Sequence, residues 1–348
     1  MRGSKSESYF SAEPQAESKR CDLCDGTDFE LIARHDRRGK ELPTGLCTAC
    51  GLVSHWKIPS EVDLQDFYAT HYRREYHGET TPSARRVMRA WRTAKRIQRQ
   101  VGPSLAPGSD VFDVGAGIGC VAKVFELAGH PASGIEPNFG FQDFSKNQLR
   151  ARVESGDLWD VPRQAACDTV LLIHVIEHFR SPRQALRHIH GILKPGGQLY
   201  VECPNLGAPF TTRPKLFHLA HIHNFTPATL EMLARRCGFE IVRWFSKPAD
   251  PNLQVLLRRI ETEQLEIIAG SYRQTMAALE RFGPWSYHLR LSYLLPRAVK
   301  LLSYALEYAI ADRYVTRILG NCAAAAEAAA KAAEKNAPAD SSDQRSAA

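Results

Sequence analysis

Short apolar runs recur through the middle of the chain, and a more polar, helix-like segment follows each of them. The runs lie at residues 111–114, 132–136, 151–154, 167–173 and 198–203. Their length and composition are typical of buried strands. After the fourth run, Ser181 and Pro182 have the residue types of a helix N-cap and a first helical position. Strands that alternate with helices predict an α/β domain with a doubly wound sheet.

A glycine-rich turn follows the first predicted strand. Gly115, Gly117 and Gly119 occupy alternate positions after Asp113, and Glu136 ends the next predicted strand. Glycines allow a tight turn and close approach of a ligand to the backbone. A carboxylate at the end of the second strand can accept both hydroxyls of a ribose, so this plan predicts an adenosine-binding domain. The spacing differs from the G-x-G-x-x-G of dinucleotide sites.

This turn resembles motif I of class I S-adenosylmethionine-dependent methyltransferases. The resemblance continues through Gly156-Asp157-Leu158-Trp159, the run from Asp168 to His178 and Lys194-Pro195-Gly196-Gly197, and covers roughly residues 105–245. It implies the Rossmann-like fold of that family and S-adenosylmethionine as the cofactor. The residues that it implies for cofactor binding are Asp113, Gly115, Ala116, Gly117, Gly119, Glu136, Asp157, Leu158 and His174.

Candidate catalytic side chains gather after the fourth predicted strand. His174, Glu177 and His178 lie at positions i, i+3 and i+4 of a helical turn. The carboxyl ends of strands in such sheets face the ligand. His178 is the candidate general base because imidazole titrates near neutral pH, and Glu177 orients it or binds the substrate. His221 and His223 lie in a later loop, which in relatives returns over the acceptor pocket.

Three interpretations of these side chains remain open. The histidines and Glu177 take up a proton and position the acceptor, or they serve only as structural residues. Alternatively, His174, Glu177, His178 and one of His221 or His223 bind a divalent ion. Some small-RNA and quinone-precursor O-methyltransferases resemble this segment, with E-x-x-E-H where this chain has His at the first position.

Four cysteines form a second motif ahead of this domain. Cys21-x-x-Cys24 and Cys47-x-x-Cys50 are separated by twenty-two residues. Two such pairs at this separation predict a tetrahedral zinc site, and four thiolates leave no position for a reacting water, so we expect structural zinc. The arrangement resembles the N-terminal zinc module of some bacterial sugar and natural-product methyltransferases.

Composition adds a cellular expectation. The first twenty residues are polar, no run of eighteen apolar residues exists, and the net charge of +7 is mild for 348 residues. The other five cysteines are scattered, and most lie in apolar contexts, as reduced core residues do. We therefore expect a cytoplasmic protein without a signal peptide or transmembrane segment.

The predicted organisation has six parts. They are a disordered N-terminus (1–20), the zinc module (21–58), a helical connector or lid (59–104), the cofactor-binding domain (105–250), a C-terminal helical region (251–321) and an Ala-rich, mostly disordered tail (322–348). The connector carries Tyr68, His71, Tyr72, Tyr76 and His77, which contact substrate or pack on the zinc module. Its basic run from Arg85 to Arg99 predicts a solvated helix face, with nucleic-acid binding as the alternative.

The C-terminal region reads as helix over 261–268, 272–281 and 289–308, the last broken by Pro296. We expect these helices to pack on the connector or on a second subunit as a homodimer, rather than on a membrane surface.

The functional expectation is methyl transfer to a hydroxyl of a small molecule, such as a sugar, a nucleotide-linked sugar or a specialised metabolite. The position of the base-amine motif N-P-P-Y holds Ile173-His174-Val175-Ile176 instead. Two alternatives remain, an RNA methyltransferase that grips RNA through the zinc module and the Arg-rich helix, and a non-catalytic scaffold.

Overall fold

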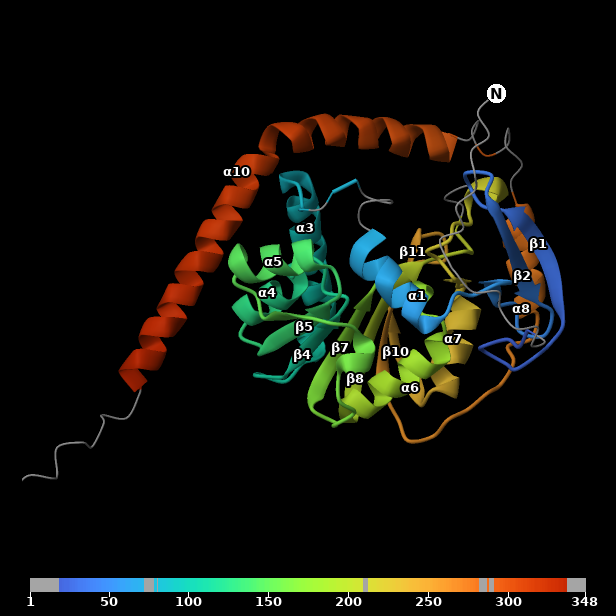
Figure 1. The fold of residues 1–348 in the computed structure, drawn as a ribbon, viewed down its shortest axis with the longest axis horizontal. Coiled ribbons are helices and arrows are strands. Elements are labelled where there is room, and N and C mark those ends of the chain that lie inside the picture. Colours follow the sequence, from blue (N-terminus) through green and yellow to red (C-terminus); the bar gives the residue numbers. More distant parts are fainter. Residues whose placement is uncertain are drawn as a thin grey trace, which may run out of the picture.

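A computed structural model describes residues 19–71, 78–79, 81–208, 212–281, 287 and 291–336 (Figure 1). The predicted disordered segment up to residue 18, the lid residues Tyr72, Tyr76 and His77, the side chain of His71 and the tail from residue 337 lie outside the described residues.

The elements follow in chain order. The strands are β1 (Phe29–His35), β2 (Glu41–Cys47), β3 (Val53–His55), β4 (Val111–Val114), β5 (Ala132–Glu136), β6 (Val153–Ser155), β7 (Cys167–Ile173), β8 (Leu193–Pro204), β9 (His223–Asn224), β10 (Phe239–Trp244) and β11 (Asn252–Arg259). The helices are α1 (Glu61–Asp66), α3 (Ala84–Val101), α4 (Cys120–Leu127), α5 (Phe139–Asn147), α6 (Pro182–Ile192), α7 (Pro227–Arg236), α8 (Ser271–Glu280) and α10 (Leu291–Asn336). Short helical turns are η1 (Phe67–His71), η2 (Gly102–Ser104), η3 (Leu158–Asp160), η4 (Ile176–His178) and η5 (Arg213–Lys215).

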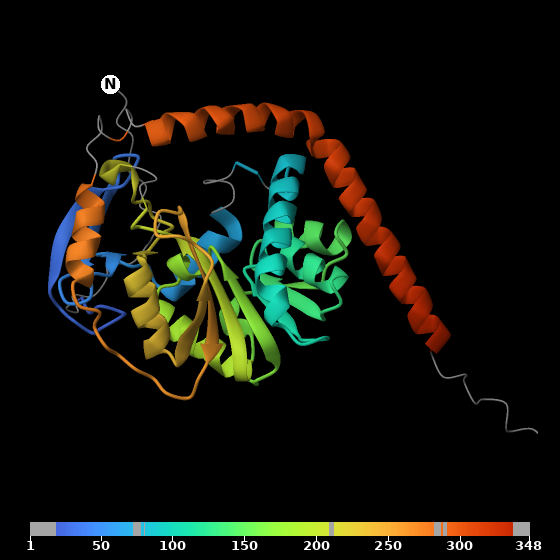
Figure 2. The ribbon, with the colours of Figure 1, turned by 180° about the vertical axis from the view of Figure 1, so that it is seen from behind.

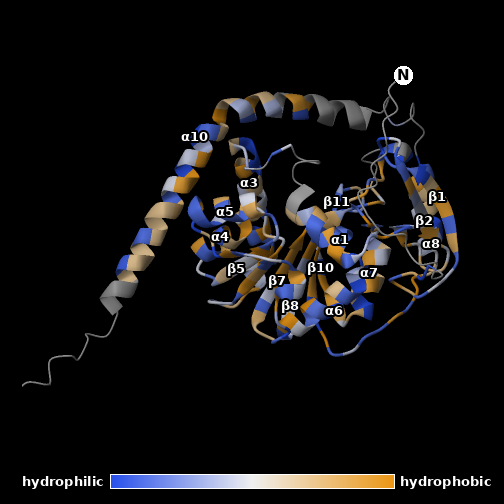
Figure 3. Ribbon diagram, viewed as in Figure 1, coloured by the Kyte–Doolittle hydropathy of each residue, from blue (hydrophilic) through white to orange (hydrophobic). Residues whose placement is uncertain are grey.

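The larger sheet confirms the predicted fold class. Its strand order is β10-β11-β8-β7-β4-β5-β6, and the pairs from β6 to β8 are parallel. The order reverses at β4, so the carboxyl ends of β4 and β7 border a crevice where ligands bind in open α/β sheets. Hydrophobic residues concentrate on the central strands (Figure 3).

Helices cover both faces of this sheet. On one face, α6 and α7 bury residues such as Leu186 and Leu233 against β7, β8 and β11. On the other face, α3, α4 and α5 pack through residues such as Trp91, Phe125 and Phe141 (Figures 1 and 2). The predicted cap at Ser181 is present, because its side chain accepts from the Gln184 amide at the start of α6. Thr226 caps α7 in the same way.

The boundary placed at residue 250 is wrong, because the sheet continues beyond it. Strand β11 inserts antiparallel between β8 and β10, with Leu253, Val255 and Leu257 buried. The helix predicted over 261–268 is also wrong. Residues 261–267 are exposed and have no helix, since the segment offers no apolar stripe for packing.

The cysteine-containing segment folds as a small antiparallel sheet of order β1-β2-β3-β9. Strand β9 comes from the loop between β8 and α7, so the module and the larger domain share this sheet. Helix α8 packs on the module, where Thr275 Oγ1 donates to the carbonyl of Gly51 at 3.1 Å. The cysteine-containing module therefore packs against both the larger domain, through β9, and helix α8 (Figure 1).

The basic face of α3 is only partly covered. Arg85, Arg86 and Arg96 are half-buried, whereas Arg89, Arg92, Lys95 and Arg99 remain exposed, as expected for a solvated face. Helix α10 is continuous through Pro296 and crosses α3 (Figures 1 and 2). Arg85 stacks 3.7 Å from the ring centroid of Tyr308, and Arg89 pairs with Glu307 at 2.5 Å. Cation–π contacts and ion pairs thus hold the C-terminal helix on the connector, as the first packing alternative expects.

No helix among the described residues is both long enough and apolar enough to cross a membrane.

Candidate active site

The glycine turn has the backbone geometry that its residues allow. Gly115, Gly117 and Gly119 all have positive φ. A Cβ on Gly115 would lie 2.7 Å from Val175 Cγ2, and a Cβ on Gly119 would lie 2.1 Å from Ser145 Oγ. Only glycine satisfies both the dihedral and the space, so the turn is fixed against the end of β7.

Two acids flank this turn. Glu136 is 3% exposed, and its Oε2 accepts from the Gly117 amide at 2.8 Å while Oε1 accepts from the Asn138 amide. Asp113 is buried behind the turn. Burial and the neighbouring Glu136 raise the pKa of Asp113 to about 8. A cationic group placed nearby would favour its charged form, and the amino group of the expected cofactor is such a cation.

One cavity of about 620 Å³ joins the predicted cofactor residues to the predicted catalytic residues. Gly115, Glu136, Asp157, Leu158 and His174 line it together with Glu177, His178 and His221. A smaller cavity of about 200 Å³ lies beside it and is lined by Asp113, Ala116, Gly117 and Arg86 among others.

Helix α1 closes the cavity at Asp157, which the sequence did not predict residue by residue. Gln65 Nε2 donates to Asp157 Oδ2 at 2.7 Å, and Trp159 Nε1 donates to Glu61 Oε1 at 2.6 Å. Arg86 of α3 lines both cavities. Glu61 and Gln65 lie about a hundred residues before Asp157 and Trp159, so no local pattern predicts these contacts. The predicted lid role of the connector was the one indication of them.

Glu177 is the most unusual side chain of the cavity. It is 1% exposed, and among the described residues neither carboxylate oxygen has a hydrogen-bond partner. Oε1 lies 3.4 Å from His174 Nδ1, 3.9 Å from His178 Nε2 and 4.0 Å from His221 Nε2. A buried carboxylate needs a compensating positive charge, so His174, His178 or a bound cation must provide it.

The pKa directions agree with this charge balance. Burial favours the protonated form of Glu177, but the neighbouring His178 and His174 prevail and lower the pKa of its carboxyl. Burial likewise opposes a charge on His174, but the Glu177 contact raises its pKa. Burial and the nearby His178 hold the pKa of His221 well below its ordinary value, so this ring is neutral.

The orientation of His178 follows from its hydrogen bond. Its Nδ1 lies 2.6 Å from the carbonyl oxygen of Ala220. A carbonyl can only accept, so Nδ1 carries the proton and Nε2 is the basic nitrogen of the neutral ring. The rings of Tyr68 and His221 each lie 5.2 Å from the His178 ring, between centroids.

The structure does not bring His223 to this cavity. It is 1% exposed, and its Nε2 donates to the carbonyl of Arg180 at 3.1 Å. The reason is that His223 belongs to β9, which pairs with β3 of the cysteine module. His174 does reach the cavity, from a backbone with φ of +56°.

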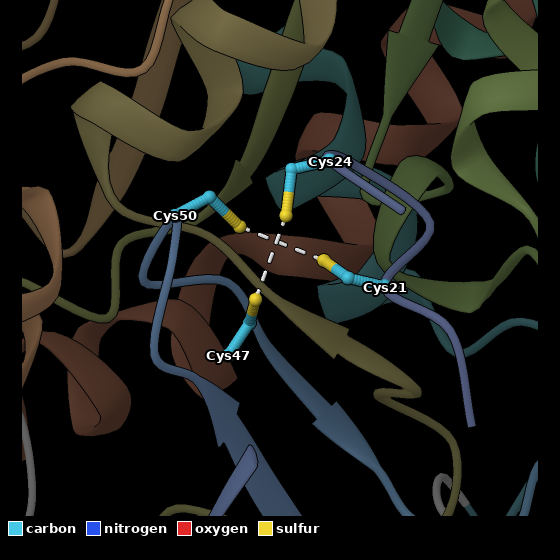
Figure 4. Close-up of side chains that lie close together, drawn as sticks. All are labelled: Cys21, Cys24, Cys47 and Cys50. Carbon is cyan, nitrogen blue, oxygen red and sulfur yellow. Dashed lines mark hydrogen bonds between the residues drawn. The ribbon is translucent and has the colours of Figure 1, made fainter. Parts of the chain in front are cut away.

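The four cysteines converge on one point (Figure 4). The sulfurs of Cys21 and Cys50 are 3.5 Å apart, as are those of Cys24 and Cys47. Tetrahedral thiolates with Zn–S bonds of about 2.3 Å stand about 3.8 Å apart, so the arrangement fits zinc. Hydrogen bonding to Cys21 contributes most to lowering the pKa of Cys24 to about 7.

A buried histidine of β3, His55, predicts a pH-dependent stability. Burial lowers the pKa of His55 to about 3, while its Nε2 donates to the carbonyl of His218. The unfolded ring binds a proton below its ordinary pKa and the folded ring does not, so stability is lost as the pH falls below about 6.5. At pH 5 this amounts to about 2 kcal/mol.

We therefore expect urea unfolding between pH 7 and pH 5 to show a smaller loss of stability in His55→Asn than in the wild type, by about 2 kcal/mol. His35→Asn, on the exposed end of β1, serves as the control. Equal losses of stability in all three proteins would contradict the prediction, because they would show that unfolding causes no proton uptake by His55.

A family model described as "Methyltransferase domain" matches residues 84–243. This part of the chain is therefore similar to methyltransferase domains. The match begins at α3, which the structure packs against α4 in the same core. The recognition made from the glycine turn is thereby confirmed for this part of the chain.

Curated relatives match parts of the chain. The chain is 32% identical over 124 residues to a tRNA U34 carboxymethyltransferase of Idiomarina loihiensis, over 32% of this chain and 38% of the relative. It is 25% identical over 117 residues to a mitochondrial ubiquinone biosynthesis O-methyltransferase of Dictyostelium discoideum, over 28% and 36%. The chain thus spans half or less of the length of these relatives.

Among solved structures, magnesium protoporphyrin IX methyltransferase from Synechocystis PCC 6803 with bound SAH matches with a TM-score of 0.44 and 16% identity, over 57% of this chain and 100% of that one.

Proposed function

We propose that this chain is an S-adenosylmethionine-dependent methyltransferase that acts on a hydroxyl of a small molecule, such as a sugar, a nucleotide-linked sugar or a specialised metabolite. The observation that carries the proposal is the single cavity lined by Glu136 and Asp157 at one end and by Glu177, His178 and His221 at the other. The proposed adenosine site and the proposed proton acceptor would then share this one cavity.

The bound cofactor would supply an electrophilic methyl group on a sulfonium. Glu136 would accept the ribose hydroxyls, and Asp113, which regains its charge beside a cation, would accept from the amino group. The glycine turn lets the backbone approach this ligand closely. These residues would hold the cofactor next to the cavity that the imidazoles line.

The basic nitrogen of His178 would take the proton of the acceptor hydroxyl while that oxygen accepts the methyl group, whose bond to sulfur breaks to release SAH. Its Nδ1–H bond to Ala220 keeps the ring in one tautomer, and the Glu177 carboxylate stabilises the imidazolium that results. Both roles follow from the geometry of a buried carboxylate 3.9 Å from Nε2.

A second mechanism uses the same atoms. Single ligand atoms of Glu177, His178 and His221 lie within 4.8 Å of one another, which suits a divalent cation that would activate a diol. Addition of Mn²⁺ to the zinc-loaded protein tests it. Mn²⁺ binding to the wild type that is lost in Glu177→Gln would support the cation mechanism. Absence of Mn²⁺ binding to the wild type would favour proton transfer by His178.

Replacement of His178 tests the proposal directly. In a screen of hydroxyl-bearing acceptors with S-adenosylmethionine, we expect His178→Asn to lower kcat by roughly 100-fold or more. The amide of Asn can still donate to the Ala220 carbonyl, so cofactor affinity should remain within about threefold. His35→Asn is the control, and a wild-type rate in His178→Asn would contradict the assignment.

RNA is the second candidate acceptor, and the tRNA relative favours it. The contacts of α3 do not, because Arg85, Arg89 and Arg92 contact Tyr308, Glu307 and Tyr314 of α10. Tight RNA binding that weakens steeply with salt would favour this candidate over a small molecule. A non-catalytic scaffold is the remaining alternative, and absence of cofactor binding would favour it.

A further inference from the structure

The first cysteine knuckle contacts the start of α6. Asp22, between Cys21 and Cys24, accepts from the Ser181 hydroxyl at 2.6 Å through Oδ1 and from the Arg183 amide at 2.8 Å through Oδ2. The amides of a first helical turn have no partner within the helix. Asp22 therefore supplements the Ser181 cap from outside the helix.

This contact lies next to the acceptor end of the cavity. Only Phe179 and Arg180 separate His178 from the Ser181 cap. The carbonyl of Arg180 accepts from His223. The backbone between His178 and α6 is therefore fixed by His223 as well as by Asp22. A shift at the start of α6 would move η4, which carries Glu177 and His178.

The second knuckle leads to the other imidazole. Strand β3, which follows Cys50, pairs Ser54 with His223. The His55 amide donates to the carbonyl of Ile222 at 3.0 Å, next to His221. Both segments that supply imidazoles to the cavity are thus bonded to the cysteine module, one through each knuckle.

The first knuckle is held by its cysteines, by the fully buried Leu23 and by ion pairs. Residues 21–24 belong to no strand. Besides the sulfur contacts, Asp25 pairs with Arg183 at 2.9 Å and with Arg236, which also donates to the Leu23 carbonyl. Four thiolates on one ion would join residues 21–24 to β2 and fix Asp22 relative to β3.

We propose that Asp22 is a positioning residue, and that zinc in the four-cysteine centre is coupled through it to the placement of Glu177 and His178. The role of those two residues in methyl transfer rests on the proposed function, but the coupling itself is a property of the fold. Zinc then contributes to the acceptor site without contacting it.

Hydrogen exchange followed by mass spectrometry on the full, zinc-loaded chain tests the coupling. In Asp22→Ala we expect exchange in the segment 174–184 to rise by about tenfold, because a lost cap bond has about that effect on local opening. Exchange in 111–136 should stay unchanged, zinc should remain at one per chain, and SAH affinity should stay within about threefold. Removal of zinc from the wild type should raise exchange in 174–184 and in 217–226.

Asp25→Ala is the matched control, since it removes the ion pairs of the same knuckle and leaves the α6 cap intact. Unchanged exchange at 174–184 in Asp22→Ala, or an equal rise in Asp25→Ala, would overturn the proposal. The ¹⁵N shifts of the His178 ring give a second readout, because its Nδ1–H bond to Ala220 should weaken only in Asp22→Ala. Absence of SAH binding to the wild type would count against the proposed function and not against the coupling.

Discussion

Glu136→Ala is expected to weaken S-adenosylmethionine binding by about 100-fold, which corresponds to about 3 kcal/mol. A carboxylate that accepts two ribose hydroxyls makes two charge-assisted hydrogen bonds, each of about 1.5 kcal/mol or more. Glu136 is 3% exposed and also receives the Gly117 amide, so its removal loosens the glycine turn as well. Calorimetric titration of the full chain measures the change.

Glu154→Ala is the control for this prediction. Glu154 lies on β6, the strand beside β5, and is exposed to solvent. The same change of charge there should leave affinity within about twofold, because a surface carboxylate makes no desolvated contact. Equal affinities in wild type and Glu136→Ala would show that the ribose lies elsewhere.

Cys47→Ser should cause the largest loss of stability of any change considered. Its sulfur belongs to the buried four-cysteine cluster, and the module's own apolar cluster is small. A structural zinc contributes directly to folding free energy, so its loss should cost at least about 3 kcal/mol and lower the melting temperature by about 10 °C. Thermal unfolding with zinc analysis of the same sample measures both.

Cys167→Ser provides the comparison, because Cys167 is a half-buried free cysteine outside the cluster. It should retain one zinc per chain and unfold within about 3 °C of the wild type. If Cys47→Ser keeps its zinc and its melting temperature, the four cysteines are not a metal site.

Local patterns predicted the central fold well. The strand at 111–114 and its glycine turn follow from apolar residues and from positions that only glycine can occupy. Ser181 predicted the start of α6, because a cap is decided by its own side chain and the next three residues. Glu177 and His178 came together for the same reason, since they share one turn.

Contacts between distant segments could not be predicted in this way. The segment 252–259 contains a short apolar run, but nothing local shows that it inserts into the sheet beside β8. His221 and His223 lie in the same loop, and the sequence gives no reason to prefer one as a site residue. The pairing of β9 with β3 takes His223 away from the cavity. Nothing local shows that α10, about two hundred residues later in the chain, packs across part of the basic face of α3.

The most direct test of the account is calorimetric titration of S-adenosylmethionine and SAH into the purified full chain, with zinc quantified in the same sample. The account predicts micromolar binding of both ligands to protein that contains one zinc per chain. Absence of binding in folded, zinc-loaded protein would contradict it.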